Sequence, residues 1–311
     1  MALLTAEHLG QLSDIGIFQP SGLNDDKRLQ AVGSPFFAVD KGYAEEIDDA
    51  MRASRVKTTG GFLAEIAIVD ASQLSNSAEL VEEAVRNRQN NYLSLRNPNR
   101  LEVVPKSVVT QLELRGDGEK RAMVISQEFD AAHQPVGDPD IKPSFIQVLN
   151  RTPRNFARDV SGSVVGLERP KLCVAEFAEE FKQPIESWQI QREPLVNRQD
   201  TLRYAESVVR TYMVLANMAV AQFAFRHDVP ILYRTFDPAG RFKQAMYSVI
   251  PLRHKFLSSY PVPIYSHYTS PLRRASDLVN HLQIGRFLAG EDLIFDRKAL
   301  SGIAQHLSSP R

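Results

Sequence analysis

Apolar residues fall into short blocks in the first half of the chain. Phe36–Val39 and Phe62–Val69 are almost continuously apolar, and each run is followed by an aspartate, which is typical of a buried strand. Residues 108–114 and 121–129 alternate between apolar and polar positions, so they predict paired strands joined by a turn at 115–118. The first half is therefore expected to form a sheet.

The second half has helical spacing. One helix is predicted earlier, with Asn76 as its start signal and Leu80, Val81, Ala84 and Val85 on its apolar face. Residues 172–181 and 202–225 predict further helices, and residues 230–233 a short strand.

A final helix is predicted to begin with Ser270 as N-cap and Pro271 at the first helical position, and to end at Gly290. Strands that come mostly before helices predict an α+β fold around one sheet-centred core.

Composition narrows the class of protein. The 311 residues carry 37 Lys and Arg against 37 Asp and Glu, which excludes a nucleic-acid binder that works by overall positive charge. The single cysteine, Cys173, excludes a disulfide scaffold and fits a reducing compartment, so a cytoplasmic location is expected. The longest uncharged apolar stretch, residues 211–225, is shorter than the roughly 20 residues of a membrane span, so no membrane partner is expected.

The most unusual stretch is an acidic turn with five carboxylates, which belong to Asp40, Glu45, Glu46, Asp48 and Asp49. Two like charges about 4 Å apart repel by about 4 kcal/mol at an effective dielectric constant of 20, so such a cluster needs water or a cation. Mg²⁺, which prefers oxygen ligands, is one candidate. The other interpretation is a solvated loop before a helix, and charge alone favours that one.

A basic segment lies near the start of the last predicted helix. Arg273 and Arg274 fall in the expected first turn, where free backbone N–H groups favour an anion such as phosphate. The alternative is a surface helix in which one of these arginines pairs with Asp277.

Both segments resemble the RNase II/RNase R (RNB) family of exoribonucleases. Residues 40–50 are similar to the family motif Asp-x₅-Asp-x-Asp-Asp-Ala, and residues 267–281 to His-x-Thr-Ser-Pro-Ile-Arg-Arg-Tyr-x-Asp-Leu-x-x-His. Between them, residues 112–114 resemble the family's Cys-Ser-Leu, with Glu113 in place of the serine. The resemblance runs in order from about Asp26 to Leu300 and implies a mixed, mainly antiparallel sheet wrapped by helices.

The resemblance also implies roles for individual residues. Asp48 resembles the aspartate on which cleavage most depends, and Arg273 the arginine that holds the scissile phosphate. Glu46 stands where the family has a further aspartate. The expected metal ligands are Asp40, Glu46 and Asp49, and the expected RNA-binding residues are Tyr92 and Arg274. His267 and His281 are expected to be structural hydrogen-bonding residues.

The implied organisation is an N-terminal head over residues 1–25 and a nuclease domain over residues 26–311, without the family's flanking OB-fold domains and C-terminal end. The implied function is Mg²⁺-dependent 3′→5′ hydrolysis of single-stranded RNA to nucleoside 5′-monophosphates, with a protein partner as one route to RNA capture. Glu46 and Arg210 depart from the family pattern. They motivate the alternative of a weak or inactive module that binds RNA or a protein.

Overall fold

The structure is a computed structural model of the 311-residue chain. It describes residues 35–40, 42, 44–75, 78–86, 102–161, 174, 177, 198–236, 245–254 and 263–308.

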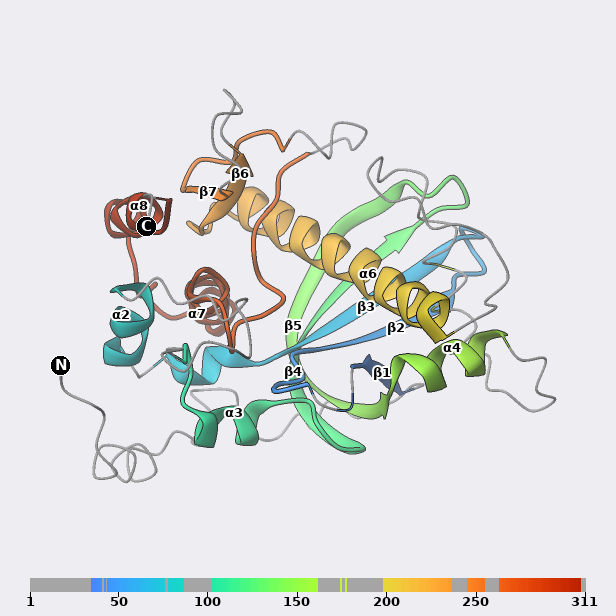
Figure 1. The fold of residues 1–311 in the computed structure, drawn as a ribbon. Coiled ribbons are helices and arrows are strands. Elements are labelled where there is room, and N and C mark those ends of the chain that lie inside the picture. Colours follow the sequence, from blue (N-terminus) through green and yellow to red (C-terminus); the bar gives the residue numbers. More distant parts are fainter. Residues whose placement is uncertain are drawn as a thin grey trace.

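Five strands of the first half close into a barrel (Figure 1). Four neighbouring pairs are antiparallel, and β1 closes the barrel by pairing in parallel with β5, so that Phe36 lies opposite Val148. The strands are β1 (Phe36–Val39), β2 (Asp49–Arg55), β3 (Phe62–Val69), β4 (Gly118–Phe129) and β5 (Pro135–Arg151). The mixed, mainly antiparallel sheet and the α+β class are therefore confirmed.

The two continuously apolar runs form β1 and β3 with the predicted bounds. All of β3 except Leu63 is buried, because one face lies inside the barrel and the other is covered by the long helix α6 (Arg198–Arg226). Figure 1 shows α6 running across the barrel strands.

Helix α6 is apolar on nearly all sides. The part Arg203–Arg226 is long and apolar enough to cross a membrane, but most of it is buried inside the protein. Val208, Met218 and Val220 lie on different faces of the helix and are all buried, as in the core helix of a globular domain. Helix α4 (Pro153–Ser161) packs against it.

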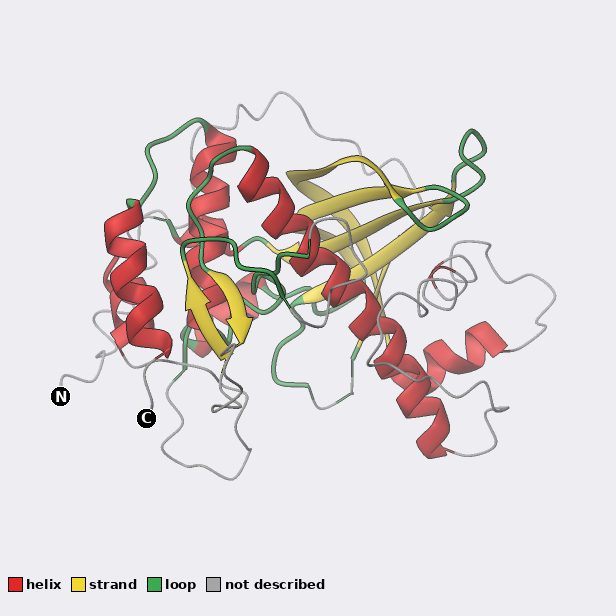
Figure 2. Ribbon diagram, turned by 90° about the horizontal axis from the view of Figure 1, so that it is seen from above, coloured by secondary structure: helices red, strands yellow, loops and turns green. Residues whose placement is uncertain are grey.

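The C-terminal part, together with two short helices that follow β3, forms a second layer beside the barrel. Helix α7 (Ala275–Ala289) packs on the short helix η1 (Ala71–Leu74) that follows β3, and Gly290 ends α7 with a positive φ of 69° as predicted. Figure 2 shows a two-stranded sheet beside these helices. The remaining elements of this layer are α2 (Ala78–Arg86), β6 (Tyr233–Phe236), β7 (Ala245–Ser248) and α8 (Arg297–Ser308).

Three predicted elements differ from the structure or fall outside it. Residues 108–114 are not a strand, because Lys106–Leu112 form helix α3, whose Val108, Val109 and Leu112 turn one face to the core. The predicted strand at 230–233 starts only at Tyr233. Of the predicted helix at 172–181, only Val174 and Phe177 are among the described residues.

The start of α7 also differs from the prediction. Ser270 is not its N-cap, because residues 271–273 form a turn and the helix begins at Ala275 with Arg274 as the N-cap residue. The carboxylate of Asp277 accepts a hydrogen bond from the Ser270 backbone N–H (2.8 Å) and thereby holds the turn against the helix. Arg273 therefore lies in the turn that precedes the helix.

Candidate active site

The acidic loop, residues 44–48, lies at one end of the barrel between β1 and β2. Its end is tied to β3, since the Val69 N–H donates to the Asp48 carbonyl oxygen (2.8 Å). On the other side, the Asp40 N–H donates to the carbonyl oxygen of Arg151 at the end of β5 (3.1 Å). The barrel strands thus place the backbones of Asp40 and Asp48 at the same end of the sheet.

The turn before α7 meets this loop. Nε of Arg273 donates to Oδ2 of Asp48 at 3.2 Å, although the two residues are 225 positions apart in the chain. The same Nε lies 3.6 Å from Oε1 of Glu46. The two segments that resemble the family motifs therefore lie side by side, and the guanidinium of Arg273 is in direct contact with the carboxylates.

Burial strongly affects the two aspartates. Burial raises the pKa of Asp48 to about 7, although the Arg273 guanidinium lowers it and nearby Glu46 raises it further. Burial also raises the pKa of Asp49 well above its usual value, and repulsion from Asp40 and Asp48 adds to the effect. Asp40, Asp48 and Asp49 therefore form an electrostatically coupled group.

The donor chemistry of this group fits a divalent cation. Oδ1 of Asp48 and Oδ2 of Asp49 are buried and have no hydrogen-bond partner. Within the described part of the chain, no three acidic, histidine or cysteine side chains are gathered as a metal site. Mg²⁺, however, is usually bound in enzymes by one or two carboxylates together with water and substrate phosphate, so the carboxylates of this group are a suitable set of donors.

Glu46 lies beside Arg273, and its expected role as a metal ligand stays a prediction. Its carboxylate lies toward Arg273, and its side chain is 15% exposed. In the structure, the Glu46 carboxylate is in ion-pair contact with the Arg273 guanidinium.

Arg274 is paired with a residue of its own helix. One of its Nη atoms donates to Oδ1 of Asp277 (2.6 Å) and to Oγ1 of Thr269 (3.2 Å), and both members of the ion pair are buried. This position does not support the RNA-binding role expected of Arg274, because the guanidinium is used inside the protein.

The other expected residues are a tyrosine and two histidines. Tyr92 lies outside the described residues, so its role stays a prediction. The Nδ1 of His267 hydrogen-bonds with the Tyr247 hydroxyl (3.0 Å), and the Nε2 of His281 with the Tyr268 carbonyl oxygen (2.8 Å). Both histidines are buried with lowered pKa values, so they are neutral structural residues, as expected.

Two contributors were missed in the sequence. The Ser270 hydroxyl accepts a hydrogen bond from Arg273 Nη2 (2.8 Å) and so helps to orient it. The buried carboxylate of Glu113 accepts one from the Ile47 N–H (3.3 Å) in the acidic loop. The substitution of a charged residue for the serine of the resembled pattern was the only available signal for Glu113.

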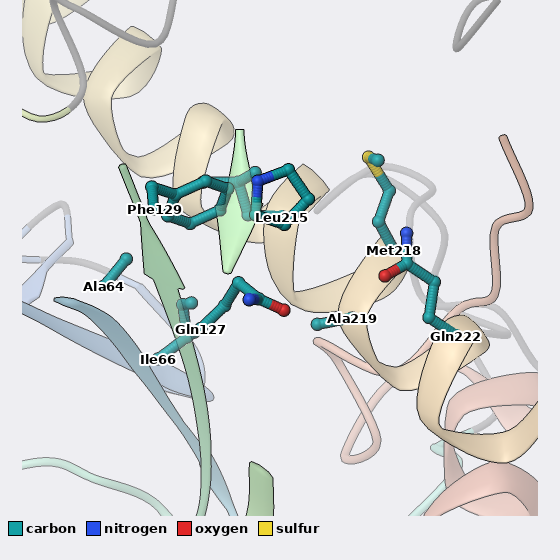
Figure 3. A pocket seen from close by; sticks show the side chains of 9 residues that line it. Ala64, Ile66, Gln127, Phe129, Leu215, Met218, Ala219 and Gln222 are labelled. Carbon is teal, nitrogen blue, oxygen red and sulfur yellow. The ribbon is translucent and has the colours of Figure 1, made fainter. Parts of the chain in front are cut away.

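A pocket away from the acidic loop differs from the candidate active site in the polarity of its lining. It lies between the barrel and α6, and Figure 3 shows strand and helix side chains facing each other across it. Its lining is apolar apart from two glutamines and includes no residue of the acidic loop. The lining residues are Ala64, Ile66, Gln127, Phe129, Pro135, Leu215, Met218, Ala219 and Gln222.

The fold and the site define an α+β domain in which a loop of carboxylates at a barrel end meets an arginine from the turn before a helix. The sequence model of the RNB domain matches residues 28–241, and the chain belongs to this family.

The chain is similar to parts of longer proteins. Over 137 residues it is 31% identical to Ribonuclease II, chloroplastic/mitochondrial, from Arabidopsis thaliana, an alignment that covers 36% of this chain and 17% of that protein. Mycoplasma genitalium RNase R, solved with ribose-methylated single-stranded RNA, has a TM-score of 0.71 at 18% identity over 92% of this chain and 56% of its own.

A third similar structure is that of yeast Ssd1, described as a pseudonuclease. It has a TM-score of 0.67 at 15% identity, over 88% of this chain and 41% of its own. The likeness to the two solved structures shows the fold, and the chain spans less than two thirds of the length of each of these three relatives.

Proposed function

We propose that this domain hydrolyses single-stranded RNA from the 3′ end and releases nucleoside 5′-monophosphates with the help of Mg²⁺. The observation that carries the proposal is the contact between Arg273 and Asp48, two residues on separate segments that lie at the barrel end beside two further aspartates. Membership of the RNB family and the likeness to an RNase R solved with single-stranded RNA support RNA as the substrate.

The carboxylates and the arginine have complementary roles in the proposal. Asp49 would hold Mg²⁺ through its buried oxygen, with Asp40 close by. Once bound, the ion would supply charge neutralisation at the phosphate and a more acidic water. Arg273, whose side chain is 28% exposed, would turn from Asp48 to a phosphate oxygen and stabilise the negative charge that develops there.

Asp48 is also placed to accept a proton during the proposed reaction. Its Oδ1 is buried and lacks a hydrogen-bond partner, and its pKa of about 7 in the metal-free protein is suited to accepting a proton at neutral pH. We propose that this oxygen receives the proton of the attacking water. Tyr92 is proposed to stack on the last base, since every base has a π-face.

The test is the digestion of a 5′-labelled single-stranded RNA with Mg²⁺. The wild-type protein should give products shortened from the 3′ end, and Asp48→Asn should cleave far more slowly while it keeps the wild-type melting temperature or exceeds it. Glu65→Gln is the matched control, because Glu65 is a similarly buried carboxylate that pairs with Arg52 on the barrel. Equal cleavage by wild type and Asp48→Asn would reject the assignment.

A second candidate function is an RNA-binding module without hydrolysis. The position of Glu46 favours it, because a carboxylate that neutralises Arg273 competes with phosphate. Calorimetric titration with Mn²⁺, alone and with a short oligonucleotide, separates the two functions. Absence of metal binding in both titrations would support the inactive module.

A further inference from the structure

One neighbouring segment, residues 106–115, hydrogen-bonds to the backbone of the acidic loop at several points. Residues 44–48 do not belong to any strand, so their backbone groups need partners from elsewhere. The backbone of Ile47 is bonded twice: its N–H donates to Glu113 Oε2 (3.3 Å), and its carbonyl oxygen accepts from the Leu114 N–H (2.9 Å). This places the peptide before Asp48 in a fixed position.

Two basic side chains hold the preceding part of the loop. Nη2 of Arg115 donates to the Ala44 carbonyl oxygen at 2.7 Å. Nζ of Lys106, at the start of α3, donates to the Glu45 carbonyl oxygen at 2.6 Å. Together with Glu113 and Leu114, these side chains bond the loop along its length from one segment, residues 106–115.

Glu113 and Arg115 also hold each other. Nε of Arg115 donates to Oε1 of Glu113 at 3.0 Å, so each carboxylate oxygen of Glu113 has one partner. The Glu113 side chain is only 5% exposed, whereas that of Arg115 is 40% exposed. Hydrogen bonds to a charged group are stronger than those between neutral groups, so this pair is a firm anchor for the loop.

The segment itself is anchored to the barrel. Nδ2 of Asn150 in β5 donates to the Leu114 carbonyl oxygen (3.0 Å), and the Asn150 N–H donates to Oδ1 of Asp117 (2.8 Å). A rigid strand therefore supports the residues that support the loop. The serine of the pattern that residues 112–114 resemble is too short to bond both Ile47 and Arg115, so this anchor depends on the glutamate of this chain.

We propose that Glu113 and Arg115 are positioning residues that fix the acidic loop so that Asp48 and Glu46 face Arg273. The inference rests on the proposed function and adds to it a support that lies behind the site. Neither residue makes a hydrogen bond to a side chain of the acidic loop. Their action passes through the backbone of Ala44 and Ile47.

The test compares steady-state RNA hydrolysis by variants of the full chain. A displacement of a reacting group by about 1 Å can cost about 10²-fold in rate, so Glu113→Ala should lower kcat by about 10²-fold and leave KM for RNA within about threefold. Arg115→Ala should lower kcat by about 10-fold, since it loses one of the anchors and its half-exposed side chain leaves the core intact.

Glu65→Ala is the matched control for a buried carboxylate with an arginine partner away from the site. It should lower the melting temperature and leave kcat of the folded protein unchanged. If Glu113→Ala does not fold, Arg115→Ala decides the question.

The outcomes separate the inference from the function on which it rests. Wild-type protein without RNA hydrolysis would overturn both. Active wild-type protein together with an unchanged kcat in Arg115→Ala, and in Glu113→Ala where it folds, would overturn only the positioning role. A kcat loss that merely follows the unfolded fraction, as measured by circular dichroism, would overturn it as well.

Discussion

Two adjacent arginines of this chain form ion pairs that differ in how completely the partner carboxylate is hydrogen-bonded. Arg274 pairs with Asp277 three residues along its own helix, at 2.6 Å, and Asp277 receives further hydrogen bonds from Ser270 and Ser276. Arg273 pairs with Asp48 from a distant part of the chain, at 3.2 Å, and leaves the second oxygen of Asp48 buried without a hydrogen-bond partner. The first pair organises the turn, and the second retains binding capacity for a ligand.

The difference shows that, within one short turn, one arginine can stabilise the fold while its neighbour faces the candidate active site. Breaking a buried, fully hydrogen-bonded ion pair strongly destabilises the folded state, so this pair can fix the backbone at Arg274. Because that backbone is fixed, the neighbouring Arg273 is directed toward the barrel end. The incomplete bonding of Asp48 is then a property of the site, since a cation or a substrate can supply what the protein does not.

The largest expected effect concerns the structural pair. Asp277→Ala removes one partner from a buried ion pair, so the free energy of unfolding should fall by about 3–5 kcal/mol. Urea unfolding measures this change. Arg286→Ala is the control: it breaks the partly exposed pair with Glu291 at the other end of α7 and should cost about 1 kcal/mol or less. A loss below about 1 kcal/mol for Asp277→Ala would remove the distinction between the two arginines.

The second effect concerns the functional pair. Arg273→Ala should lower kcat for RNA hydrolysis by about 10²–10³-fold, because it removes a donor to the developing charge on the phosphate. The free energy of unfolding should change by about 1 kcal/mol or less, since the Arg273 side chain is partly exposed. Steady-state kinetics and urea unfolding of the same preparation provide both numbers. Activity within about threefold of wild type would mean that Arg273 only neutralises the acidic loop.

The smallest effect is a pH dependence of stability in the metal-free protein. Burial raises the pKa of Asp48 to about 7, so the folded state binds a proton there more tightly than the unfolded chain does. The resulting stabilisation is fully present below about pH 4 and is lost as the pH rises through 7. Between pH 5 and pH 8, wild type should lose about 2–3 kcal/mol relative to Asp48→Asn, as measured by urea unfolding in the presence of EDTA. If the free energies of unfolding of wild type and Asp48→Asn change in parallel with pH, burial does not raise the pKa of Asp48.

Local patterns predicted the elements that need only local information. β1 and β3 were predicted to the residue because their apolar runs are interrupted sharply at Asp40 and Asp70. Residues 108–114 show the limit of this approach, since so short a run of apolar and polar residues fits a strand and a short helix equally well. Only the surrounding fold selects the helix.

The candidate site could be predicted only in part from the sequence. Resemblance to family motifs brought Asp48 and Arg273 together, and the structure places them in contact. Arg273 and Arg274 could not be told apart in the sequence, because both lie within four residues of Asp277 and the turn that separates them depends on tertiary packing. Glu113 acts on a residue 66 positions away, and no local pattern encodes such a contact.

A double-mutant cycle on the Asp48–Arg273 pair tests the central claim most directly. The cycle measures kcat/KM for single-stranded RNA in wild type, Asp48→Asn, Arg273→Ala and the double variant. If the two residues form one catalytic unit, the kcat/KM of the double variant should be no more than about 10-fold below that of the less active single variant. Losses that multiply in the double variant would show that the two residues act independently and would contradict a shared site.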